Sequence, residues 1–150
     1  MVYVECKPDV ALVESLGISY RDIEHTGGKS GVCKKLEKQF NSIGLVDEDP
    51  GAGTPSYINT LKLSAQENCI KIFIDNKNKT KLIMLCPKLE EWILKVAKKS
   101  KIDPKKYGLP DNPSFLHSKI NSDIQNFKLF LNELVGTKEI IFLKETIKIE

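Results

Sequence analysis

Three acidic residues stand directly after two short apolar runs and could together bind a cation. Glu5 follows Val2–Val4, and Asp47 and Asp49 follow Ile43–Val46 just before a Pro-Gly turn. If both runs are strands of an open α/β sheet, their carboxyl ends mark the edge where ligands bind. Carboxylate oxygens suit Mg²⁺ or Mn²⁺. The spacing therefore predicts a divalent-metal site, although an acidic surface turn with Glu5 facing solvent explains the same residues.

Other acids and a glycine-rich turn are candidates for the same edge. Gly27, Gly28 and Lys29 precede an expected helix, so their backbone N–H groups and the lysine could hold a phosphate. A nucleotide P-loop would need glycine at position 23, where the chain has Ile23, and we therefore exclude it. The candidates for a second metal are Glu48, Glu90 and Glu91. Glu48 is expected to point away from its two neighbours, and helix-dipole electrostatics equally explain Glu90 and Glu91.

Length and composition fit one globular domain. The chain has 150 residues, of which 41% are hydrophobic and 29% charged, with a formal net charge of +3. Lysines concentrate between Lys77 and Lys106, which permits contact with a phosphate polymer or simply solvates the surface. Four dispersed cysteines and two distant histidines give no zinc spacing. We expect a cytoplasmic protein with reduced thiols and no membrane segment.

Apolar periodicity and turn residues predict alternating strands and helices. The secondary structure of Ile58–Cys69 is ambiguous, and we interpret this run as a short helix. We expect Ser114–Val135 to form one helix or two, and Thr137–Glu150 to form a helix or a strand. The expected strands are Val2–Cys6, Ile18–Ile23, Ile43–Val46, Ile70–Asp75 and Lys81–Cys86, and the expected helices are Pro8–Leu16, Gly31–Phe40 and Leu89–Lys99. This order predicts an α/β fold, with four to five mostly parallel strands flanked by helices and a helical C-terminal part.

The order of these motifs resembles the TOPRIM domain, the metal-dependent fold of topoisomerases, primases and OLD-type nucleases. The resemblance rests on Glu5 in Val-Tyr-Val-Glu-Cys and on Asp47 and Asp49 in Gly-Leu-Val-Asp-Glu-Asp-Pro-Gly, and these motifs cover about the first half of the chain. The later stretch Cys86–Trp92, Cys-Pro-Lys-Leu-Glu-Glu-Trp, resembles a segment of small TOPRIM-like proteins. The chain departs from the family at Cys6, where members often have glycine.

The resemblance implies a Rossmann-like TOPRIM sheet in a single domain over residues 1–150, with a core at 1–100 and a helical extension at 101–150. It implies Mg²⁺ or Mn²⁺ bound by Glu5, Asp47 and Asp49. Glu5 would act as general acid or base, Lys29 would neutralise a phosphate oxygen, and the reaction would be phosphodiester cleavage. Nucleic acid and a separate ATPase protein are the implied partners, and the oligomeric state stays open.

Two other functions fit the same residues. The chain could be a non-catalytic TOPRIM-fold module that binds a partner protein through its C-terminal helices. It could also be a receiver-like phosphoacceptor domain, in which Lys88 would be the lysine after a late strand. We rank the receiver third, because that family usually places its acid pair directly after the first strand and here Cys6-Lys7-Pro8 follows Glu5.

Overall fold

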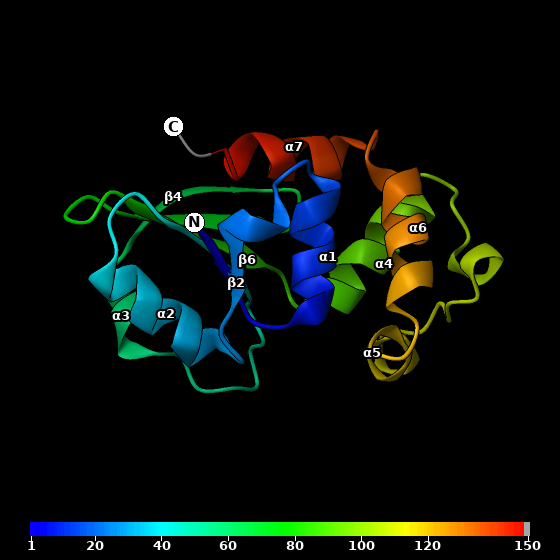
Figure 1. The fold of residues 1–150 in the computed structure, drawn as a ribbon, viewed down its shortest axis with the longest axis horizontal. Helices are drawn as coiled ribbons and strands as arrows, with labels where there is room; N and C mark the ends of the chain where they lie inside the picture. Colours follow the sequence, from blue (N-terminus) through cyan, green and yellow to red (C-terminus); the bar gives the residue numbers. More distant parts are fainter. Residues whose placement is uncertain (149–150) are drawn as a thin grey trace.

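The computed structural model describes residues 1–148 and contains one six-stranded sheet (Figure 1). The strand order is β2-β1-β3-β6-β5-β4, in which β2, β1, β3 and β6 are parallel and β5 and β4 are antiparallel additions. The strands are β1 (Val2–Val4), β2 (Ile23–His25), β3 (Ile43–Asp47), β4 (Lys62–Glu67), β5 (Ile70–Asp75) and β6 (Thr80–Leu85). The expected α/β class is confirmed, and the sheet has six strands rather than four to five.

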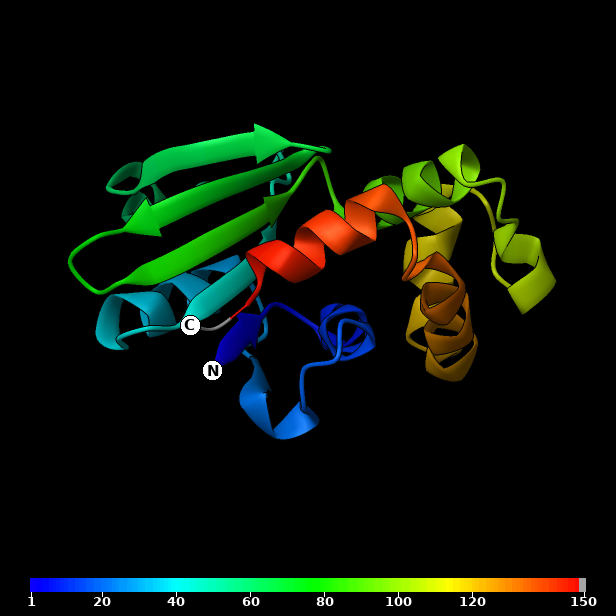
Figure 2. The same ribbon diagram turned by 90° about the horizontal axis from the view of Figure 1, so that it is seen from above.

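Two helical layers enclose the sheet, as Figures 1 and 2 show. Helices α2 (Lys29–Lys38) and α3 (Ser56–Asn59) cover one face, and the remaining helices gather on the other side, where α6 packs against α1 and α5 packs against α4. These are α1 (Lys7–Ser15), α4 (Leu89–Lys99), α5 (Pro113–Ile120), α6 (Ile124–Leu134) and α7 (Lys138–Thr146), with short 3₁₀ turns at Tyr20–Asp22 and Pro104–Tyr107. No helix of residues 1–148 is both long enough and apolar enough to cross a membrane.

Strand β3 shows how side-chain alternation creates two cores. Ile43 and Leu45 pack into the cluster shared with α1, α4 and the C-terminal helices, whereas Val46 packs against α2 and α3. Successive strand residues face opposite sides of a sheet, so a strand covered on both sides is apolar throughout. Gly44 allows α2 to approach closely, because a Cβ there would lie 2.7 Å from Val32 Cγ1.

The expected helix at Ile58–Cys69 is wrong for most of its length. Only α3 is helical, and Lys62–Glu67 forms the edge strand β4, which pairs antiparallel with β5. Every residue of β4 is exposed, so the strand carries little of the apolar alternation that predicts one. The backbone pairing with β5 defines it, and that contact is not visible in a local sequence pattern.

The C-terminal part consists of separate helices. The predicted stretch Ser114–Val135 is divided between α5 and α6. The predicted stretch Thr137–Glu150 is a helix over Lys138–Thr146, and its residues 149–150 lie outside the described part of the chain. These helices share one apolar core with the sheet, which joins Val4, Leu85, Trp92 and Phe127. Lys81 Nζ of β6 donates to the carbonyl of Thr146 at 2.8 Å, which connects α7 to the sheet.

Candidate acidic site at the carboxyl edge of the sheet

The structure brings Glu5 and Asp47 together. Strands β1 and β3 are parallel neighbours with Val4 opposite Leu45, so the residues that follow them emerge at the same edge. Glu5 Oε2 accepts the backbone N–H of Asp47 at 2.7 Å. A side chain from the end of one strand therefore binds the backbone at the end of the next.

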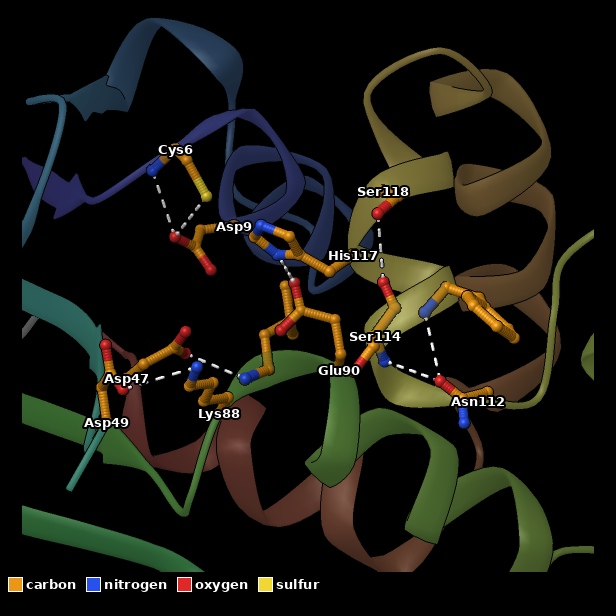
Figure 3. A network of polar contacts seen from close by, with 12 residues as sticks. Cys6, Asp9, Asp47, Asp49, Lys88, Glu90, Asn112, Ser114, His117 and Ser118 are labelled. Carbon is orange, nitrogen blue, oxygen red and sulfur yellow. Dashed lines mark hydrogen bonds and ion pairs between the residues drawn. The ribbon is translucent and has the colours of Figure 1, made fainter. Parts of the chain in front are cut away.

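Asp47 in turn holds the start of helix α4. Its Oδ1 accepts the backbone N–H of Leu89 at 2.9 Å, which satisfies one of the free donors in the first turn of that helix. The next residue, Glu90, is buried, and its Oε1 lies 2.8 Å from Nδ1 of His117 on α5. Figure 3 shows this arrangement, in which α1, β3, α4 and α5 each contribute a polar side chain to one region.

Burial and mutual repulsion raise the pKa values of these acids. The pKa of Asp47 rises to about 8, chiefly through burial and then through the charges of Asp9, Glu5 and Glu90. Burial raises the pKa of Asp9 to about 7, and it also raises the pKa of Glu5 despite two backbone hydrogen bonds. The cluster therefore holds protons at neutral pH, and a cation placed among the carboxylates would displace them.

Asp9 and His117 belong to this region but were not among the residues predicted from the sequence. Asp9 lies in the first turn of α1, and its Oδ2 accepts hydrogen bonds from Cys6 N at 3.1 Å and Cys6 Sγ at 3.2 Å. An acid three residues after a helix N-cap is an ordinary capping signal, which conceals any other role. Nothing local marks His117, because only packing of α5 against α4 brings it to Glu90.

The glycine turn lies at the same edge. The N–H of Gly27 donates to the carbonyl of Glu5 at 3.0 Å, and Gly28 is the N-cap of α2. Lys29, the first residue of that helix, extends its ammonium to the carbonyl of Glu48 at 2.7 Å. The predicted phosphate-binding segment therefore borders the acidic residues, with the lysine reaching across to the loop after β3.

The remaining predicted acids are held in different ways. Glu48 Oε2 lies 2.6 Å from Lys71 Nζ of β5, so this side chain points away from Asp47. Asp49 Oδ1 lies 3.4 Å from Lys88 Nζ, and both side chains are partly exposed. Glu91 Oε2 is buried and has no hydrogen-bond partner in the described part of the chain.

The geometry limits what these side chains can bind on their own. Within residues 1–148, no group of three or more His, Cys, Asp or Glu side chains is arranged to hold a metal ion. Mg²⁺, however, usually keeps several waters and uses only one or two protein carboxylates together with substrate phosphates. Carboxylates from two neighbouring strands, with a lysine and a helix N-terminus beside them, can accept that type of partly hydrated ion.

Comparisons of the chain with protein-family models, curated proteins and solved structures find no match.

Proposed function

We propose that this protein is a Mg²⁺-dependent, phosphodiester-cleaving protein of the TOPRIM type. The observation that carries the proposal is the contact between Glu5 and the backbone of Asp47 at the carboxyl edge of two adjacent parallel strands. This is where open α/β sheets place their ligands. A separate ATPase protein remains part of the proposal only through the family resemblance.

The donor chemistry of the edge fits Mg²⁺ or Mn²⁺. Glu5, Asp47 and Asp49 would hold the ion through hard carboxylate oxygens, as such cations prefer. Asp49 would have to leave Lys88, whose contact at 3.4 Å is longer and partly exposed. Glu48 and Glu90 are less suitable as ligands for a second ion, because they are held more closely, by Lys71 at 2.6 Å and by His117 at 2.8 Å. When bound, the ion would supply charge neutralisation at a phosphate oxygen and a more acidic water.

The chain's own residues supply the remaining chemistry. Burial raises the pKa of Glu5 above its ordinary value, which favours the protonated form and suits a group that takes up and gives up a proton as a general acid or base. Lys29 would move its ammonium from the Glu48 carbonyl to a non-bridging phosphate oxygen. The free N–H groups in the first turn of α2 would orient the same phosphate.

The test compares the wild-type protein with Asp47→Asn in a plasmid-cleavage assay containing Mg²⁺ or Mn²⁺. Asp22→Asn, an exposed acid remote from this edge, is the matched control. We expect Asp47→Asn to lower the cleavage rate at least about 100-fold, since even outer-shell partners of metals are worth 10–100-fold. Equal cleavage by wild type and Asp47→Asn, or no cleavage by wild type with either metal, would refute the proposal for the isolated chain.

Thermal unfolding gives a second measurement that needs no substrate. If the metal binds the folded state with a dissociation constant of about 1 mM, 10 mM Mg²⁺ adds about 1.4 kcal/mol of stability. For a chain of this size that raises the melting temperature by about 3–6 °C. Asp47→Asn should abolish the shift.

A non-catalytic binding module is the second candidate. It is favoured by exposed apolar side chains on the C-terminal helices, namely Phe115, Leu129 and Ile141, and by the lack of a three-ligand metal group in residues 1–148. The thermal measurement separates the two functions, because a module without a metal site should show no shift at 10 mM Mg²⁺.

A further inference from the structure

A groove at the far end of helix α4 combines an apolar floor with a lysine rim. Its volume is about 610 Å³, within the range of ligand-binding sites. The residues that line it are Leu94, Lys95, Lys98, Lys101, Ile102, Asp103, Pro104 and Asp111. None of these is aromatic, and none belongs to the acidic site.

The positive charge of this groove is largely uncompensated. Within residues 1–148, neither Lys98 nor Lys101 forms an ion pair. Of the two acids in the lining, Asp111 is balanced by the ammonium of Lys105 at 3.3 Å, whereas Asp103 accepts only the backbone N–H of Lys105 at 3.0 Å and keeps its negative charge. The three lysines of the lining, Lys95, Lys98 and Lys101, therefore outweigh one uncompensated aspartate. The groove therefore presents lysines that are free to neutralise an anionic ligand.

Lys101 occupies its position at a conformational cost. It follows the C-cap Ser100 of α4 and has φ of 58°, in the left-handed region where helices normally place glycine or asparagine. For another residue this conformation costs on the order of 1 kcal/mol. The chain nevertheless has a lysine there, three residues after Lys98 and on the lining of the same groove.

We propose that this lysine groove binds the phosphodiester backbone of double-stranded DNA, an inference that rests on the proposed phosphodiester-cleaving function. Backbone contacts by lysine are electrostatic and independent of sequence. A single strand would call for aromatic side chains on which bases stack, and the groove has none.

Helix α4 fixes the distance between the groove and the acidic site. Leu89, which donates to Asp47, and Lys98 are nine residues apart, or about 14 Å at 1.5 Å per residue. At 3.4 Å per base pair this corresponds to about four base pairs. A duplex held by Lys98 and Lys101 would thus have phosphates within reach of the acidic edge.

The test measures binding of a fluorescein-labelled 24-base-pair DNA duplex by anisotropy in EDTA, between 50 and 200 mM salt. The variant is Lys98→Gln/Lys101→Gln, and the control is Lys34→Gln/Lys38→Gln, which removes two exposed lysines from α2. With three phosphate contacts, wild-type affinity should fall about 40-fold over this range of salt. With one contact left in the variant, it should fall about 3- to 4-fold.

Because EDTA prevents metal-dependent cleavage, the result is independent of nuclease activity. The proposal is supported if the control binds DNA as the wild type does while the groove variant binds DNA more weakly and with a smaller dependence on salt. Equal weakening of both double variants, no measurable binding at 50 mM salt, or tighter binding of the single strand than of the duplex would overturn it. If the groove binds DNA and the protein does not cleave it, only the nuclease proposal fails.

Discussion

Removing the charge of Asp47 should make the protein more stable at alkaline pH. An unfolded aspartate releases its proton near pH 3.8, whereas folded Asp47 keeps its proton up to about pH 8. Between these values the folded state binds more protons than the unfolded state, so the free energy of unfolding falls as pH rises. Asp47→Asn removes this term and leaves an oxygen that can still accept the Leu89 N–H.

The expected size follows from the pKa difference. About four pH units at 1.36 kcal/mol each give an upper value of about 6 kcal/mol. Part of the difference arises from Asp9, Glu5 and Glu90, which share protons with Asp47. We therefore expect Asp47→Asn to gain about 2–3 kcal/mol relative to wild type between pH 5 and pH 8.5.

Urea unfolding in EDTA measures this effect directly. Trp92 is the only tryptophan and is 1% exposed, so its fluorescence reports loss of the core. Asp49→Asn is the control, because its ion pair with Lys88 is partly exposed and is worth at most about 1 kcal/mol. A gain for Asp47→Asn that is the same at pH 5 and pH 8.5, or wild-type protein that is more stable at pH 8.5, would contradict the reasoning.

Three further substitutions test the packing of α2 on the sheet and the acidic site at the carboxyl edge of the sheet. Gly44→Ala should cost about 1–3 kcal/mol in urea unfolding, because the added methyl group meets the packed face of α2, whereas Gly136→Ala has no neighbour within 4 Å and should cost little. Asn78→Ala should cost about 1–3 kcal/mol in the same assay, since the buried amide donates to two carbonyls near the end of α2. Cys6 is exposed at its surface, but desolvation of its thiol and the Asp9 carboxylate raise the pKa of that thiol, so iodoacetamide should modify it slowly at pH 8. Asp9→Asn should speed that reaction about tenfold for each unit by which the pKa falls, as followed by mass spectrometry.

Much of the sheet could be predicted because its central strands are locally distinctive. Val2–Val4 and Ile43–Val46 are buried on both faces and are continuously apolar, so their ends, and hence the positions of Glu5 and Asp47, were predictable. The alternating run Ile70–Asp75 also formed a strand, and its turn made it the antiparallel neighbour of β6.

The rest of the site depends on contacts between distant parts of the chain. Glu90 was predicted as a possible metal ligand, yet it is paired with His117, which lies 27 residues further along the chain. Asp9 was not predicted as a site residue, because a sequence shows its place in the chain but not its distance from Asp47.

The shared core of sheet and C-terminal helices has a consequence for how the protein is made. Strand β1 is translated before the other strands but lies inside the sheet, between β2 and β3, and the apolar core that buries Val4 also contains Phe127 of α6 and Leu143 of α7. At about 5–20 residues per second, those helices follow β1 by roughly 6–30 seconds. During that time the nascent chain exposes an apolar surface that the later helices cover, so we expect early release or truncation to yield an aggregation-prone product.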